Sequence, residues 1–111
     1  MNLQEKERAV LNLYADNESL FENCQHLVFE SVWSTDFNQK KYKIIKWNHE
    51  NARKSDIYLL ANQLKKAGFS QKEIALETGD ANYKIAKNVE EYVKDIFDEY
   101  SKRLLIPKLH Y

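Results

Sequence analysis

The chain of 111 residues contains little cysteine, proline and glycine, and these shortages exclude several classes of protein. A single cysteine cannot form a disulfide within the chain, and such a lone thiol is typical of a reducing compartment. The chain has one proline and two glycines, whereas average usage gives about a dozen of these two residue types together. Because β-sandwiches and barrels need many glycine and proline turns, we expect an all-α fold.

Long apolar runs and clusters of metal ligands are also absent from the sequence. No run approaches the roughly 18 apolar residues of a membrane span, and the charged N-terminal stretch lacks the apolar segment of a secretory signal. We therefore expect a cytoplasmic protein with no membrane partner. The histidines and the cysteine lack zinc-site spacing, and the glycines are too few for a phosphate-binding loop. We expect no metal, no cofactor and no enzymatic activity.

Apolar residues recur at three- and four-residue spacing through most of the chain. This spacing predicts one domain over residues 1–111, a compact bundle of five to six helices. An amphipathic helix is predicted over residues 3–14. The wider apolar stripe of residues 18–33 predicts a central core helix. Residues 34–38 are expected to be a loop, with Asp36 as the cap of the next helix.

Residues 40–47, KKYKIIKW, suit either a strand or a helix. Tyrosine, isoleucine and tryptophan favour strands. A lone strand cannot satisfy its backbone hydrogen bonds, however, and no partner strand is evident. Helical spacing also runs through Phe37, Lys41, Ile44, Ile45 and Asn48, and we therefore predict a helix.

The second half of the chain carries clearer helix signals. A helix that begins at Ser55 is expected to end at Gly68, which would take the left-handed conformation. A short helix is then predicted to begin at Ser70. The last helix is long, covers residues 85–104, and is expected to stop at Pro107.

Charge is balanced over the whole chain but is distributed unevenly along it. The formal net charge of zero excludes a histone-like protein. Residues 1–36 hold two basic and seven acidic residues, residues 37–72 hold nine and two, and residues 73–111 hold six and eight. The sequence therefore combines an acidic N-terminal third, available to a protein partner, with a basic middle segment.

Residues 70–89, SQKEIALETGDANYKIAKNV, carry the spacing of a helix-turn-helix. Ala75 is the small residue that the second helix crosses, and Gly79 permits positive φ in the turn. Ile85 is the branched apolar residue that seats the second helix. The segment resembles the helix-turn-helix DNA-binding proteins, and it would lie within residues 55–106 together with the long last helix. Asp80 departs from the pattern, because an apolar residue usually follows the turn glycine.

The resemblance implies that the protein binds duplex DNA, as a transcriptional regulator or a DNA accessory factor. The second helix would lie in the major groove, where asparagine and lysine contact base edges and phosphates. The start of the first helix would meet a phosphate, and the neighbouring basic stretch suits the phosphate backbone. The predicted DNA-binding residues are Ser70, Gln71, Lys72, Asn82, Tyr83, Lys84, Lys87, Asn88, Lys40, Lys41, Lys43 and Lys46.

A second class of function stays open beside DNA binding. A short capped helix between longer ones is also an ordinary corner of a helical bundle, and lysine-rich helix faces are commonly only solvated. The alternative is a helical protein-interaction module, such as a small subunit or an inhibitor of a larger complex. The apolar tail after Leu104 must dock on its own core or on a second copy. We expect a homodimer through the last helix and this tail.

Overall fold

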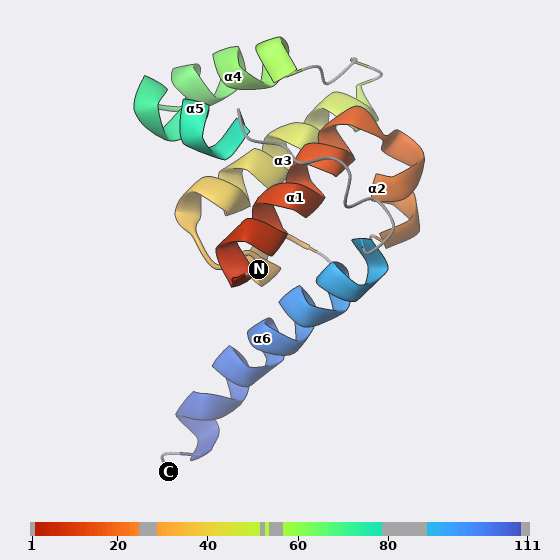
Figure 1. The fold of residues 1–111 in the computed structure, drawn as a ribbon, viewed down its shortest axis with the longest axis vertical. Coiled ribbons are helices and arrows are strands. Elements are labelled where there is room, and N and C mark those ends of the chain that lie inside the picture. Colours follow the sequence, from red (N-terminus) through yellow and green to blue (C-terminus); the bar gives the residue numbers. More distant parts are fainter. Residues whose placement is uncertain (1, 25–28, 52, 54–56, 79–88, 110–111) are drawn as a thin grey trace.

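The computed structural model describes residues 2–24, 29–51, 53, 57–78 and 89–109 (Figure 1). These residues form a bundle of helices and contain no strand, which confirms the predicted all-α fold. The elements are α1 (Leu3–Asp16), α2 (Glu18–Cys24), the 3-10 helix η1 (Glu30–Val32), α3 (Asp36–Glu50), α4 (Ile57–Lys66), α5 (Gln71–Thr78) and α6 (Val89–Leu109). None of the described helices has the length and apolarity needed to cross a membrane.

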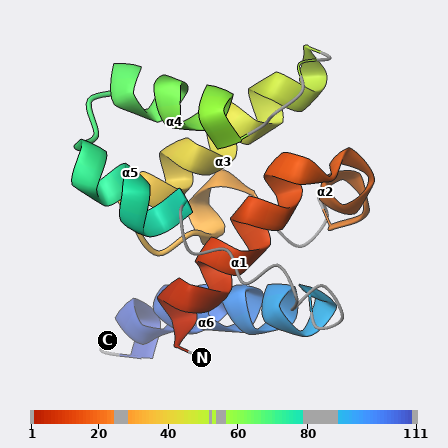
Figure 2. The same ribbon diagram turned by 45° about the horizontal axis from the view of Figure 1, so that its top comes forward.

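Helix α1 lies at the centre of the bundle, in contact with α2, α3, α4, α5 and α6. Figure 2 shows α1 between α6 on one side and the α3, α4 and α5 helices on the other. The side chains that fill the space between these helices are apolar and buried. They include Val10, Leu11, Tyr14, Ile45, Leu60, Leu64, Val93 and Ile96.

The predicted central helix over residues 18–33 is wrong. Helix α2 ends at Cys24, and the backbone at Phe29 is extended, with φ −145° and ψ 176°. Val32 and Trp33 are nonetheless both buried. Val32 ends the 3-10 turn and the backbone of Trp33 is extended, so both side chains reach the core without a continuous α-helix. The central position belongs to α1 instead.

Helix α3 confirms the helical prediction for residues 40–47. Its cap is Thr35 rather than Asp36, because the extended backbone of Thr35 lets its Oγ1 accept a hydrogen bond from the Asn38 N–H at 3.1 Å. Asp36 is the first helical residue. The predicted helix over residues 40–47 is therefore part of a longer one that begins before its first lysine.

The two predicted boundaries after α4 are confirmed. Gly68 has φ +103°, and its N–H donates to the Lys65 carbonyl at 3.1 Å. This left-handed residue ends the helix. The Ser70 Oγ accepts a hydrogen bond from the Glu73 N–H at 3.2 Å and caps α5. Ser55, the predicted cap of α4, lies outside the described residues.

Helix α6 extends past the predicted stop. It continues through Pro107 to Leu109, although the proline lacks the N–H for one backbone hydrogen bond of the helix. Val93 and Ile96 are buried against the bundle, whereas Leu104 is 52% exposed. Figure 1 shows that the last turns of α6 project away from the other helices.

Candidate interaction surface

Three lysines of the predicted DNA-binding set lie on the outer side of α3. Lys40, Lys43 and Lys46 recur every three residues and are exposed. Their ammonium groups form ion pairs with Asp36 at 3.5 Å, Glu30 at 2.8 Å and Glu50 at 3.9 Å, respectively. Exposed ion pairs of this kind contribute roughly 0–1 kcal/mol each. An anionic ligand can therefore replace these carboxylates at little cost.

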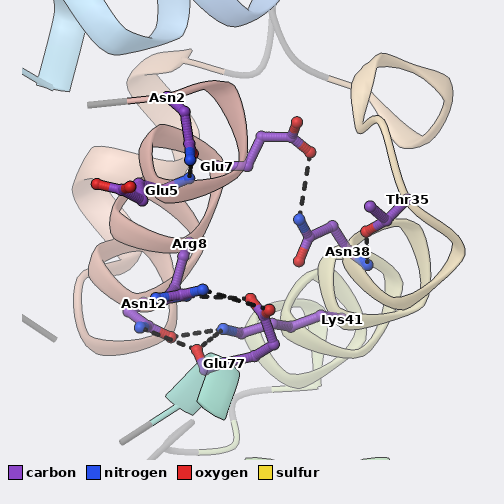
Figure 3. Close-up of polar contacts among 9 residues, drawn as sticks. All are labelled: Asn2, Glu5, Glu7, Arg8, Asn12, Thr35, Asn38, Lys41 and Glu77. Atoms are coloured by element: carbon purple, nitrogen blue, oxygen red, sulfur yellow. Dashed lines mark hydrogen bonds and ion pairs between the residues drawn. The ribbon is translucent and has the colours of Figure 1, made fainter. Parts of the chain in front are cut away.

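Lys41 does not share that outer face. Its side chain is fully buried between α1, α3 and α5 (Figure 3). The Nζ donates to the Asn12 Oδ1 at 2.6 Å and to the backbone carbonyl of Glu77 at 3.1 Å. The ammonium of Lys41 is therefore not accessible to a phosphate, in contrast to the role predicted from the sequence.

The groups around Lys41 fasten the last turn of α5 to the centre of the bundle. The carbonyl of Glu77 also accepts a hydrogen bond from the Asn12 Nδ2 at 3.3 Å. The Glu77 carboxylate pairs with the Arg8 guanidinium at 3.2 Å. Figure 3 shows these side chains converging from α1, α3 and α5. Because unpaired carbonyls at a helix C-terminus need donors, this cluster completes the end of α5 directly before residues 79–88.

Burial lowers the pKa of Lys41 from 10.5 to about 7. The Glu77 carboxylate opposes this shift and the Arg8 guanidinium adds to it. A neutral amine has two hydrogens, which match the two oxygen acceptors of Asn12 and Glu77. The protein therefore buries an amine whose pKa lies close to neutral pH.

A second buried cluster fixes the start of α3. The Glu7 carboxylate accepts hydrogen bonds from the Ser34 N–H at 2.9 Å, from the Ser34 hydroxyl and from the Asn38 Nδ2 at 3.2 Å. Glu7 is fully buried, so these donors replace the water that a carboxylate requires. The cluster holds the turn before α3 against α1.

The other predicted DNA-binding residues fall into two groups. Ser70, Gln71 and Lys72 are exposed at the start of α5. The remaining five, Asn82, Tyr83, Lys84, Lys87 and Asn88, lie outside the described residues. Within the described part of the motif Ile74 is buried as expected, but Ala75 is exposed. The second helix of the motif, which Ala75 was expected to support, lies outside the described residues.

A shallow apolar groove runs between α3 and α4, beside the lysine face. It has a volume of about 540 Å³ and is lined by Lys43, Ile44, Trp47, Gln63, Lys66 and Ala67. The amides of Asn48 and Gln63 hold its two walls together through reciprocal hydrogen bonds of 2.9 and 2.8 Å. The spacing of α3 and α4 is therefore fixed by partly buried polar contacts as well as by packing.

Trp47 is the most prominent side chain of the groove. It is 48% exposed, although tryptophan is usually among the more buried residue types. The Arg53 guanidinium lies 5.1 Å from the centre of its ring, at cation–π distance. Lys66, across the groove, has no ion-pair partner among the described residues. The groove thus has an apolar floor and a cationic rim.

The sequence alone does not single out Lys66 or Gln63, because their role depends on the pairing of α3 with α4. The available signal was the amphipathic pattern of α4, whose last turn carries Lys65 and Lys66. Such a pattern shows that the lysines are exposed but not which helix they approach.

No cluster of metal ligands occurs among the residues that the structure describes. His49, which follows Asn48 in the sequence, donates its Nε2–H to the Tyr14 carbonyl at 2.6 Å. The ring thus links the end of α3 to α1.

Comparison with known proteins gives one finding. The family model described as "DnaB-like helicase N terminal domain" matches residues 1–98. No curated protein and no solved structure matches the chain significantly. The matched span includes the buried core from Val10 to Ile96.

Proposed function

We propose, since this chain belongs to the family of DnaB-like helicase N-terminal domains, that it acts in DNA replication as a binding domain of a helicase assembly. The single observation that supports this role is the match over residues 1–98, which takes in α1 to α5 and the packed half of α6. The family is related to helicases, so the proposal does not include the transcriptional regulation considered from the sequence.

We propose further that the chain is not itself an enzyme. The sequence offers no phosphate-binding loop and no nucleophile motif, and the buried polar clusters around Glu7 and Lys41 connect helices to one another. A domain of this kind contributes binding energy and leaves chemistry to the motor of the helicase. A role in DNA replication would agree with the cytoplasmic location expected from the sequence.

Binding to a DnaB-like helicase motor tests the main proposal. The fluorescently labelled chain is titrated with the motor domains of a DnaB-like helicase from the same genome, expressed without their own N-terminal domain. We expect saturable binding by anisotropy and a changed rate of unwinding of a forked duplex. Absence of both effects at micromolar concentrations would contradict the proposal.

Binding of duplex DNA is a second candidate function, favoured by the exposed lysines of α3. Lys40, Lys43 and Lys46 lie on one side of the helix, at half-exposed positions. Against it stands the burial of Lys41. Four to six phosphate contacts would make the affinity fall steeply between about 50 and 200 mM salt.

The DNA experiment compares a substitution on α3 with substitutions in the predicted second helix of the helix-turn-helix. Lys43→Ala, Asn82→Ala and Lys84→Ala should each weaken binding of a labelled duplex while the melting temperature stays unchanged. Lys94→Ala, on α6, serves as the control for loss of one surface charge. No detectable binding of mixed-sequence duplex at low salt would remove this candidate.

We also propose that the chain forms a homodimer through α6 and the apolar tail over residues 104–111. Leu104, the first residue of the apolar tail, is 52% exposed. Burial of an aliphatic side chain contributes about 1.5–3 kcal/mol, part of which association entropy offsets. A chain truncated after Arg103 should run as a monomer by light scattering, and the full chain as a dimer. A full chain that runs near 13.2 kDa would refute the dimer.

A further inference from the structure

We propose that the groove between α3 and α4 is a docking site for an acidic amphipathic segment of a protein, held by its apolar side chains on Trp47 and by its carboxylates on the lysine rim. This inference rests on the proposed binding role and names the chemistry of the partner. The site is defined by Lys43, Ile44, Trp47, Gln63, Lys66 and Ala67.

The floor of the groove favours apolar side chains. Its apolar lining residues are Ile44, Trp47 and Ala67. Ile44 is only partly buried and packs against the core. A half-exposed tryptophan next to apolar surface provides a large, rigid contact area that loses little conformational entropy on binding. One apolar anchor of a partner therefore fits beside Trp47.

The rim of the groove favours carboxylates. Lys43 and Lys66 lie on opposite walls, Lys46 lies one turn along α3, and Arg53 lies over the Trp47 ring. The only carboxylates paired with these cations among the described residues are Glu30 and Glu50, at 2.8 and 3.9 Å. The rim thus keeps a positive excess, which complements an acidic segment.

The same features disfavour a nucleic acid in this groove. A phosphate backbone requires a polar track of donors, whereas the floor here is apolar. Base stacking on Trp47 requires an open ring face, and the Arg53 guanidinium already lies 5.1 Å above the ring. An amphipathic peptide satisfies the floor and the rim together.

Nuclear magnetic resonance of the full chain tests the proposal directly. The chain has two tryptophans, of which Trp33 is buried and Trp47 is exposed. Their indole N–H signals, assigned with Trp47→Phe, are followed during titration with a synthetic helical peptide of leucine and glutamate. We expect the Trp47 signal to shift and the Trp33 signal to stay in place.

Matched peptides and variants separate the apolar contact with Trp47 from the charge attraction to the lysine rim. A peptide with lysine in place of glutamate should not bind, and an acidic peptide with the leucines scrambled should bind at least about tenfold more weakly. Lys66→Glu and Trp47→Ala should each weaken binding by about tenfold, and Lys94→Glu, on α6, by less than about twofold.

Three outcomes would overturn the proposal. The first is a Trp47 signal that does not respond to the acidic peptide at millimolar concentration. The second is equal weakening by Lys66→Glu and Lys94→Glu, which would indicate general charge attraction. The third is a chemical-shift change of the Trp47 signal on addition of single-stranded DNA but not on addition of the peptide. Peptide binding without helicase binding would refute the proposed function alone, and the reverse result would refute the groove alone.

Discussion

Replacement of Lys41 by methionine should change how the stability of the protein depends on pH. Lys41 has a pKa of about 7 in the folded protein and 10.5 in the unfolded chain. Between these values the unfolded chain binds the extra proton, so the free energy of unfolding rises with pH. Below pH 7 both states are protonated and this contribution is constant. Lys41→Met retains the length of the side chain but removes the titrating amine.

The expected magnitude follows from the two pKa values. Each full pH unit between them is worth about 1.36 kcal/mol, and the slope develops gradually around pH 7. The wild type should therefore gain about 2 kcal/mol relative to Lys41→Met between pH 7 and pH 9. The comparison stops at pH 9, because the unfolded chain begins to release the Lys41 proton as the pH approaches 10.5.

Urea unfolding at closely spaced pH values provides the measurement. The buried Trp33 reports on the core by fluorescence, and circular dichroism follows the helices. The difference between the two proteins should be flat below pH 7 and rise above it. Parallel curves from pH 6 to pH 9 would refute the argument that desolvation governs Lys41. The ¹³Cε shift of Lys41, titrated in the folded protein, gives an independent value of the same pKa.

Three further substitutions test the local structure. Gly68→Ala should cost about 1–2 kcal/mol, because Gly68 has φ +103° and an added Cβ would meet open space, so that the cost is backbone strain alone; Gly68→Asn should cost less, and equal values for the two would contradict this account. Thr35→Ala should lower the stability by about 1 kcal/mol through loss of the α3 cap, whereas the adjacent Ser34→Thr, which retains the hydroxyl bonded to Glu7, serves as a milder control. Glu7→Gln should cost about 1–3 kcal/mol, because an amide cannot accept all the hydrogen bonds that the carboxylate receives, and an unchanged melting temperature would show that the cluster is dispensable.

Local signals in the sequence predicted the parts of the fold that depend on neighbouring residues. The left-handed Gly68 and the Ser70 cap are determined within a few residues of the chain, and both are found as predicted. The break at Phe29 depends instead on how Val32 and Trp33 reach a core that α1 and α6 supply. Periodicity alone cannot detect such a break, because it registers local spacing and not the position of core residues on other helices.

The spacing of the sequence indicated that Lys41 could be buried, but the surrounding lysines favoured an exposed position. Lys41 lies between Phe37 and Ile45 on the inward stripe of the helix, at four-residue spacing. Its neighbours Lys40 and Lys43 made a solvated basic face the simpler interpretation. The sequence could not show that the carbonyl of Glu77, 36 positions away in the chain, lies beside Lys41 and accepts its hydrogen bond. A buried lysine becomes acceptable only when tertiary structure supplies such partners.

Helix α3 is fastened to its neighbours along its whole length. Glu7 holds its start through Asn38, Asn12 and Glu77 hold Lys41 in its middle, and Gln63 holds Asn48 near its end. A surface carried by so rigid an element exists in the same shape before and after a ligand arrives. Little entropy is then lost in ordering it, so rigid-body recognition with fast association is expected. Any adjustment of shape that the encounter requires must come from the partner.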